Sequence, residues 1–526
     1  MCAYPSSGLR LWIIGSTLRR LSTEKANGEA ASKAAKCVAK KVVERGGDTR
    51  PSIAPKPSID IKPILKDPEL YKRNCFNRNY KWAAYNPHRI KELSKMLHQL
   101  EEKAKPLRKQ KNSLEQTLKV PKTPIEEPIA GGEKHVPEPE PWRPNSRETK
   151  LASLALLKLQ LLDIQNEANP LQAELENLSE ELPNLASPEA PIGNTPKVVG
   201  YINHEREPLH SHLSKSHVEI GKELQLLDFE AASTTTGWGW YFLMNEAALL
   251  EQALIQYALS VAVKKGWMLV SPPSIVYSHM ATACGFKPRD QNDEQQIYTL
   301  EQKDDLKPEL SLAGTAEIPI AAMNAKKILD HQQMPLKVVG VSRCYRAEAG
   351  SRGVDTKGLY RVHEFTKVEM FAWTLPSAAP GDRPCPVQTM FDEMVSIQME
   401  VLRNLNLHCR ILEMPTSDLG ASAARKQDIE AFFPSRRQKD NGWGEVTSAS
   451  ICTDYQTRRL MTRVRLADPS RIVYPHTVNG TALAVPRVVM ALLENGWDND
   501  KKVVVIPKVL RPWMGGIEAI KKRDAP

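Results

Sequence analysis

The sequence lacks most of the features that mark membrane, secreted and metal-clip proteins. No apolar run reaches the roughly 18 residues that a transmembrane helix needs, so no membrane partner is expected. The eight cysteines are scattered and none lies in a CxxC pair, so we expect no zinc site or disulfide framework, and a reducing compartment fits best. No internal repeat is visible. With 526 residues, 41% of them hydrophobic, the chain can bury a sizeable core and form two or three domains.

Acidic residues are absent before Glu24, whereas three arginines and several hydroxyl residues precede it. This composition predicts a mitochondrial presequence over residues 1–25, followed by a linker over 26–57. A disordered basic tail is the alternative. The formal net charge of +10 is consistent with an anionic partner such as nucleic acid, but a basic presequence on a mildly basic enzyme explains it equally well.

Two segments repeat apolar residues at spacings of three and four, which predicts two helices. The first runs from Ile90 to Leu118 with a break at Lys111, and the second runs unbroken from Leu154 to Leu182, the pattern of a coiled-coil seam. Residues 120–145 between them are too rich in proline and glycine to be helical. We therefore expect an antiparallel two-helix arm within residues 58–190.

The two predicted helices carry opposite net charges. Residues 81–120 contain ten Lys or Arg and four Asp or Glu (net +6), whereas residues 147–182 contain three and seven (net −4). These charges can pair with each other, and the basic helix can also meet a phosphate backbone. Pro106 and Pro170 lie inside the two patterns and are expected to kink them.

Residues 191–526 alternate helical patterns with short β-like runs, without repeated βαβ units. This mixture predicts an α+β domain with an antiparallel sheet flanked by helices. One hairpin is unusual. We expect its first strand to present Arg346 and Glu348 on one face and its second strand, Gly358–Phe371, to present Arg361, Phe365 and Glu369. Cations, a ring and carboxylates in one row fit a nucleotide joined to a small acid, and a salt-bridged surface strand is the alternative.

The segment YRAEAGSRGVDTKGLYRVHEFTKVEMF, residues 345–371, closely resembles motif 2 of the seryl-tRNA synthetases, which are class II aminoacyl-tRNA synthetases. Residues 271–276 (SPPSIV) resemble motif 1, and residues 476–496 (HTVNGTALAVPRVVMALLENG) resemble motif 3. The resemblance spans roughly residues 200–516. It implies a class II antiparallel sheet preceded by a tRNA-binding arm, a homodimer formed through motif 1, and action on ATP, L-serine and tRNA(Ser) in the mitochondrial matrix.

The resemblance also implies roles for individual residues. In nucleotide binding, Arg346 contacts the α-phosphate, Glu348 the adenine amino group, Phe365 the adenine ring and Arg487 the γ-phosphate, while Arg361 is assigned to the phosphate side. Glu445 and Ser448 correspond to residues that hold Mg²⁺ on the phosphates. Arg346 and Arg487 are the expected catalytic residues. Pro486 stands before Arg487, where the family often has glycine, and a proline at the first helical position is compatible with a helix start.

Five residues are implied for serine. Glu369 corresponds to the acid that accepts the serine hydroxyl, and Thr315 and Glu317, expected on one strand face, correspond to the ammonium site. Asn479 and Thr481 correspond to the pocket floor. His363 and Lys367 receive no catalytic role. The implied function is ATP-dependent seryl-adenylate formation and transfer to tRNA. The alternatives are an inert paralogue that binds RNA or a protein partner, and a ligase that charges a carrier protein.

Overall fold

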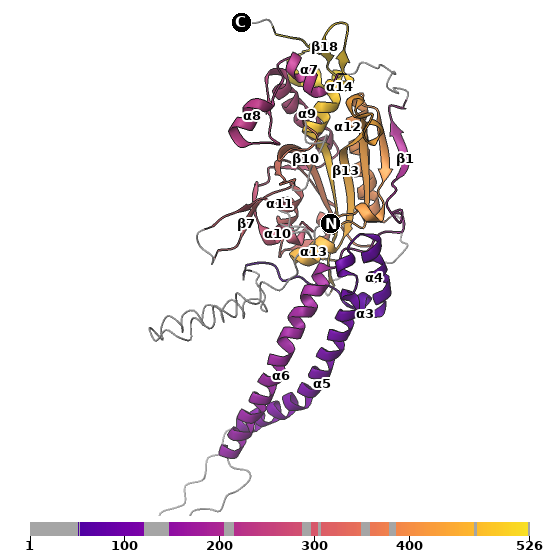
Figure 1. Ribbon diagram of the computed structural model, residues 1–526. Coiled ribbons are helices and arrows are strands. Elements are labelled where there is room, and N and C mark those ends of the chain that lie inside the picture. The colour runs from indigo at the N-terminus through magenta and orange to yellow at the C-terminus, as the bar shows by residue number, and fades with distance from the viewer. Residues whose placement is uncertain are drawn as a thin grey trace, which may run out of the picture. The chain divides into compact units, whose positions relative to one another are not determined.

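The computed structural model describes residues 51, 53–119, 147–204, 215–286, 296–302, 307–348, 358–377, 385–467 and 471–523 (Figure 1). The predicted presequence, most of the linker and the 120–145 tip lie outside these residues. So do most of residues 376–386, whose sequence PSAAPGDRPCP predicts an inserted surface loop. The chain divides into two compact units. One contains residues 99–174 and the other contains residues 50–98 with 175–526, and each is described by itself.

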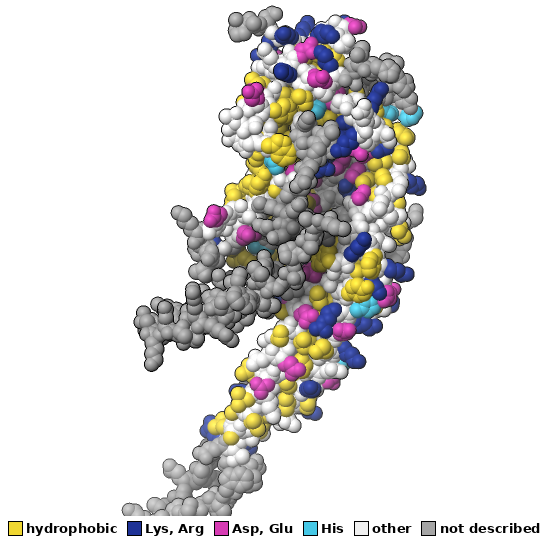
Figure 2. Space-filling view, viewed as in Figure 1, with side chains coloured by type: hydrophobic (Ala, Val, Ile, Leu, Met, Phe, Trp, Pro, Cys, Tyr) yellow, Lys and Arg dark blue, Asp and Glu magenta, His cyan; other side chains and the backbone are white. Residues whose placement is uncertain are grey.

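The first unit consists of helical segments, as the apolar spacing predicts. Helix α5 spans Asn86–Lys119 and helix α6 spans Arg147–Glu181, and both continue through their internal prolines. Within this unit the seam positions Leu100, Ala104, Leu154 and Leu157 are buried, whereas most of the residues between them are exposed. Figure 2 shows hydrophobic and charged side chains interspersed on the surface of these helices.

The second unit is built on an eight-stranded sheet with the order β1-β11-β12-β13-β16-β10-β9-β4 (Figure 1). All neighbouring strands are antiparallel except β4 and β9, so the predicted antiparallel α+β fold is confirmed. Its strands are β1 (Lys197–Ile202), β4 (Met268–Val270), β9 (Leu336–Tyr345), β10 (Glu364–Thr374), β11 (Cys409–Glu413), β12 (Arg425–Phe432), β13 (Trp443–Thr453) and β16 (His476–Ala484).

The central hairpin is shorter than the sequence pattern predicts. Strand β9 ends at Tyr345, so Arg346 and Glu348 follow the strand instead of belonging to it. Strand β10 begins at Glu364, so Arg361 precedes it. The alternation in residues 358–371 therefore predicts too long a strand, because its first part is held by loop contacts and not by a sheet ladder.

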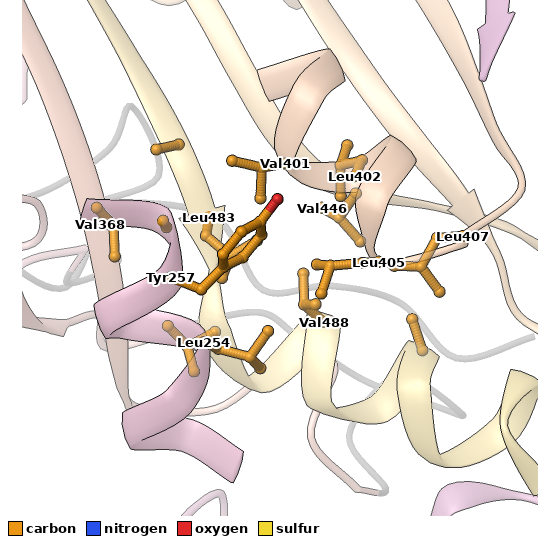
Figure 3. Packing of buried hydrophobic residues seen from close by; sticks show 14 of the residues in the cluster. Leu254, Tyr257, Val368, Val401, Leu402, Leu405, Leu407, Val446, Leu483 and Val488 are labelled. Atoms are coloured by element: carbon orange, nitrogen blue, oxygen red, sulfur yellow. The ribbon is translucent and has the colours of Figure 1, made fainter. Parts of the chain in front are cut away.

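Three helices pack against the large sheet: α9 (Asn245–Lys264), α12 (Pro386–Asn404) and α14 (Val485–Asn495). Figure 3 shows their side chains meeting those of the sheet strands. The even positions of β10, such as Val368 and Met370, enter this core, as the alternation predicts. Among its odd positions, Phe371 and Trp373 enter a second cluster with α10 (Ser278–Ala283) and α11 (Glu317–Ala322). The odd positions nearer the start of β10 belong to neither cluster, so they are the ones that can carry functional side chains.

The remaining elements are short and surround the sheet. The helices are α3 (Lys62–Lys66), α4 (Pro68–Asn77), α7 (His217–Glu223), α8 (Phe229–Thr236) and α13 (Tyr455–Leu460), with 3₁₀ turns η1 (Lys81–Ala83), η3 (His331–Gln333), η5 (Thr416–Asp418), η6 (Pro434–Arg436), η7 (Asp440–Gly442) and η8 (Lys508–Met514). The short strands are β2 (Leu227–Asp228), β3 (Phe242–Leu243), β5 (Ile275–Tyr277), β6 (Thr299–Leu300), β7 (Leu310–Leu312), β8 (Ile328–Asp330), β14 (Arg463–Arg465), β15 (Ile472–Val473), β17 (Trp497–Asp498), β18 (Val503–Val505) and β19 (Ala519–Ile520). None of the helices in the described part of the chain combines the length and hydrophobicity that a bilayer crossing requires.

The end of α6 is fastened to the large sheet by Asn184, within the second unit. The Asn184 side-chain amide donates to the carbonyl oxygens of Ser422 and Cys452, both at 2.9 Å. Arg78, the residue that directly follows α4, is only 1% exposed and donates to the carbonyl oxygens of Asn184 and Gly420. These bonds satisfy carbonyl groups that otherwise carry a desolvation cost.

We expect Asn184→Ala to lower the free energy of unfolding by about 2 kcal/mol, because two hydrogen bonds to carbonyl groups are lost at about 1 kcal/mol each. Chemical denaturation followed by circular dichroism measures this. The control is Asn169→Ala, which removes an exposed amide from the surface of α6. Equal effects of the two substitutions contradict the anchoring role of Asn184.

Candidate active site

A cleft opens on the sheet beside the odd face of β10. Its walls come from β10, β13 and β16, from the backbone after β9, from the turn before β10 and from the first turn of α14. Eight of the predicted site residues line it: Arg346, Glu348, Arg361, Phe365, Glu445, Ser448, Thr481 and Arg487. The other four are buried and are linked by hydrogen bonds or an ion pair to one another and to Lys367, which lines the cleft: Thr315, Glu317, Glu369 and Asn479. The structure therefore brings all twelve into one region.

Glu369 is held at the inner end of the cleft by the register of three strands. It lies opposite Thr481 of β16 and Gly340 of β9, and it is only 2% exposed. The Lys367 ammonium lies 2.5 Å from the Glu369 carboxylate, and the Thr315 hydroxyl donates to it at 3.3 Å. An unpaired carboxylate is costly at this depth, and the ion pair with Lys367 supplies a partner that also orients the Glu369 side chain.

Sequence reasoning assigned no role to Lys367. The signal for it is present, because residues 367 and 369 have the same parity on β10 and therefore share one face. Lys367 also lines the cleft, so its side chain contacts both buried Glu369 and the open part of the site.

Glu317 lies beside Glu369 but on a different kind of element from the one predicted. Thr315 precedes helix α11 and Glu317 is its first residue, so the expectation of a shared strand face is wrong. Gln456 donates to the Glu317 carboxylate at 2.5 Å, and the Asn479 side-chain amide also donates to it. Gln456 is a further residue that the sequence did not indicate, since it lies on α13, 139 positions away from Glu317.

Burial and, after it, the neighbouring charge of Glu369 raise the pKa of Glu317 to about 8, although Lys367, Gln456 and Asn479 act to lower it. The two carboxyl groups of this buried pocket are therefore not fully balanced by positive charge. A ligand with an ammonium group supplies the missing positive charge, and a ligand hydroxyl can donate to the remaining carboxylate oxygen.

The outer part of the cleft carries cations and a flat ring. The Arg346 guanidinium lies 5.3 Å from the centre of the Phe365 ring, and its Nε donates to the carbonyl oxygen of Gly314 at 3.4 Å. Arg361 forms an ion pair with Glu348 at 3.1 Å. Although Arg361 and Glu348 are outside the strands, the turn before β10 brings them together beside Phe365.

Arg487 projects from the start of α14. The helix begins at Val485 with Pro486 in its first turn, which a proline tolerates because the first N–H groups of a helix lack intrahelical partners. Arg487 donates to the carbonyl oxygen of Tyr360 at 3.2 Å and lies 3.2 Å from the Glu445 carboxylate. The substitution of proline for the common glycine therefore leaves Arg487 directed into the cleft.

Glu445 is flanked by positive charge. Burial alone raises the pKa of its carboxyl, but Arg487, Lys426 and Arg346 together outweigh burial and lower the pKa well below its ordinary value. Glu445 therefore stays ionised at neutral pH. Its carboxylate and the Ser448 hydroxyl on β13 are hard oxygen donors that suit Mg²⁺, which is commonly held by one or two carboxylates together with substrate phosphates. Among the residues that the structure describes, no cluster of three or more His, Cys, Asp or Glu is arranged to hold a metal ion.

These features define a class II aminoacyl-tRNA synthetase core: an antiparallel sheet with the cleft between its central hairpin and the strand–helix unit of β16 and α14. Residues 298–496 match the model of the tRNA synthetase class II core domain (G, H, P, S and T). Across most of its length the chain is also similar to serine–tRNA ligases. It is 38% identical over 476 residues to the mitochondrial serine–tRNA ligase of Saccharomyces cerevisiae, covering 88% of this chain and 95% of that protein. The chain therefore belongs to the seryl-tRNA synthetase family.

Two further comparisons agree with this assignment. The mitochondrial serine–tRNA ligase of Schizosaccharomyces pombe is 37% identical over 461 residues, which cover 87% of this chain and 88% of that protein. The crystal structure of seryl-tRNA synthetase from Pyrococcus horikoshii complexed with ATP superposes with a TM-score of 0.74 at 29% identity, covering 89% of this chain and 100% of that one.

The raised pKa of Glu317 predicts a pH-dependent stability. Below its ordinary pKa of 4.5 the carboxyl is protonated in both the folded and unfolded chains. Between pH 4.5 and about 8 only the unfolded chain has released this proton, so the contribution of Glu317 to stability falls as pH rises through this window. We expect Glu317→Gln, in the absence of substrate, to gain melting temperature relative to the wild type between pH 5 and 8.

Thermal melts of both proteins across this pH range measure the difference. Glu301→Gln removes an exposed carboxylate and serves as the matched control for loss of charge. A difference between Glu317→Gln and the wild type that stays constant with pH contradicts the raised pKa.

Proposed function

We propose that this chain activates L-serine with ATP to form seryl-adenylate and transfers the seryl group to the 3′ end of tRNA(Ser) in the mitochondrial matrix. The observation that supports the proposal is that the two ends of one cleft carry different chemical groups. Buried Glu317 and Glu369 form an end suited to an amino acid with an ammonium and a hydroxyl. Arg346, Phe365 and Arg487 form an end suited to a nucleotide triphosphate. Family membership supports the same assignment.

In the first step the serine carboxylate attacks the α-phosphorus of ATP. A carboxylate–phosphorus bond forms, the bond to the β,γ-diphosphate breaks, and pyrophosphate leaves. The attacking group is already ionised, so no base is required. Arg346 and Arg487 stabilise the charge on the transferring and departing phosphates. Glu445 and Ser448 would hold Mg²⁺, which supplies further neutralisation of phosphate charge when bound.

In the second step a terminal ribose hydroxyl of tRNA attacks the carbonyl carbon of the adenylate. The new ester bond forms, AMP departs with the electron pair of the broken bond, and the proton of the attacking hydroxyl is released. None of the described residues of the cleft is assigned as a base for this hydroxyl. The protein contributes orientation and charge stabilisation in this step.

Selectivity for serine follows from the buried pair of Lys367 and Glu369. Alanine leaves the hydroxyl-accepting oxygen of Glu369 without its donor, and a site built around a substrate hydroxyl rejects the analogue that lacks it by about 10⁴-fold. Threonine keeps the hydroxyl but adds a methyl group, which we expect this end of the cleft to disfavour because its residues Thr481 and Thr315 are buried, at 5% and 1% exposed.

Several parts of the proposal concern the rest of the chain. We assign residues 1–25 to a presequence, 26–57 to a linker, 58–190 to the tRNA-binding helical arm and 191–526 to the catalytic domain. The arm is proposed to act as a coiled coil that contacts the tRNA backbone. Motif 1, residues 271–276, is proposed to form a homodimer interface.

The decisive experiment is ATP–pyrophosphate exchange with serine, threonine and alanine, followed by charging of mitochondrial tRNA. We expect exchange with serine, little with threonine and about 10⁴-fold less with alanine, and then charging of tRNA(Ser). An inert RNA-binding paralogue binds tRNA without supporting exchange. Absence of exchange with serine by a folded protein overturns the proposed reaction.

We expect Glu369→Ala to reduce serine-dependent exchange by at least about 10³-fold while ATP binding changes little, since this carboxylate lies at the amino-acid end of the cleft. Exchange kinetics and calorimetric titration with ATP measure the two effects. Glu364→Ala is the matched control, because Glu364 lies on the opposite face of the same strand. Parallel losses of serine use and ATP binding in Glu369→Ala count against its role.

A further inference from the structure

We infer that His363 is a positioning residue, and that it acts by fixing the backbone of Arg346 from which the guanidinium enters the cleft. We also infer that the turn Trp238–Gly239–Trp240 holds the His363 ring in place for this purpose. The inference rests on the proposed role of Arg346 at the α-phosphate. It goes further by identifying what holds Arg346, which lies beyond the end of its strand.

Both backbone polar groups of Arg346 are bound by the same histidine. The Arg346 N–H donates to the carbonyl oxygen of His363 at 2.9 Å. The Arg346 carbonyl oxygen lies 3.0 Å from Nδ1 of the His363 ring. A carbonyl oxygen only accepts, so Nδ1 carries the proton and donates it to this oxygen. The two bonds together fix the orientation of the peptide groups on either side of the Arg346 Cα.

The neighbouring residues are tied to other elements. The Tyr345 N–H donates to the carbonyl oxygen of Ala313 at 3.0 Å, and the Ala347 N–H donates to that of Gln296 at 3.1 Å. Among the contacts that the structure describes for these three residues, a side chain meets a backbone carbonyl oxygen only at Arg346. His363 is therefore the side chain whose loss changes the direction of Arg346 while leaving the flanking backbone bonds in place.

Aromatic rings enclose the His363 ring. The Trp238 ring meets it edge-on at 5.3 Å between centres, and the Trp240 ring lies at 5.9 Å. The Tyr298 hydroxyl lies 3.2 Å from Nδ1. The His363 N–H also donates to the carbonyl oxygen of Gly239 at 3.0 Å, so the same turn contacts both the ring and the backbone of His363.

Gly239 allows this close approach. Its φ of +83° lies in the left-handed region, and a Cβ built there would collide with the His363 ring, lying 2.7 Å from Nε2. Gly237, two residues earlier, has a similarly positive φ of +96°, but a Cβ there meets no atom within 4 Å. The chain thus provides a matched pair of glycines, one of which faces His363.

The first test uses substitutions that differ in which ring nitrogen they replace. Asparagine places an amide N–H near the position of Nδ1, whereas glutamine places it near that of Nε2, and leucine has no donor. We expect His363→Leu and His363→Gln to lower kcat of serine-dependent ATP–pyrophosphate exchange by about 10²-fold, the effect of a small displacement of a positioned group. The KM for serine should change by less than about threefold, and His363→Asn should retain kcat within about fivefold of the wild type.

Melting temperatures separate this role from a general loss of folding. A folded His363→Leu protein with wild-type kcat overturns the inference, and so does a folded His363→Asn protein that loses as much kcat as His363→Leu. A common loss of melting temperature in all three variants, with kcat falling in proportion to the unfolded fraction, also overturns it.

The second test uses the two glycines. We expect Gly239→Ala to lower kcat by about 10²-fold through displacement of the His363 ring, whereas Gly237→Ala, which carries only the backbone strain, should leave kcat within about twofold. Equal losses in the two variants contradict the inference.

Arg346→Ala distinguishes failure of this inference from failure of the proposed role of Arg346. If Arg346→Ala stays active, Arg346 does not have the role on which the inference rests, and the inference is overturned with it. An inactive Arg346→Ala protein together with a fully active His363→Leu protein leaves the role of Arg346 intact and overturns the positioning by His363.

Discussion

The pairing of β10 with β9 on one side and β16 on the other is the constraint on which the rest of the site depends. This register sets Glu369 opposite Gly340 and Thr481, and it sends Val368 and Met370 into the core beneath α9, α12 and α14. Because side chains alternate along a strand, a slip of one residue would exchange the buried apolar residues for the charged ones. The hydrophobic core therefore selects the face that carries the chemistry.

The site also contains carboxyl groups that differ in how their charge is compensated. Glu369 is paired with Lys367, and Glu445 with Arg487, whereas Glu317 has two amide donors and no cation within an ion pair among the contacts that the structure describes. The three carboxylates therefore differ in the charge that surrounds them. Glu445 is held ionised, while burial makes Glu317 the one that gains most from a bound ammonium group. The electrostatics of the cleft therefore distinguish its two ends.

The groups that we propose to contact a nucleotide are largely carried by backbone outside the sheet. Arg346, Glu348 and Arg361 lie beyond the ends of β9 and β10, where a ladder no longer fixes them. Ligand contacts commonly lie on such loops, which a rigid scaffold positions. Here the positioning comes from particular contacts: the Arg361–Glu348 ion pair, the hydrogen bond from Arg487 to the carbonyl oxygen of Tyr360, and the two hydrogen bonds between His363 and Arg346.

The sequence by itself determined the antiparallel α+β class, the two long helices, the parity of β10 and, through the motif blocks, the candidates for the site residues. These properties depend on local periodicity or on residues close together in the chain, so they can be read from a single sequence. Only the tertiary structure decided where the strands end, that Glu317 begins a helix, that Gln456 joins Glu317, and that His363 binds Arg346. Each of these depends on backbone hydrogen bonds and burial between segments far apart in the chain, for which local sequence carries no period or spacing.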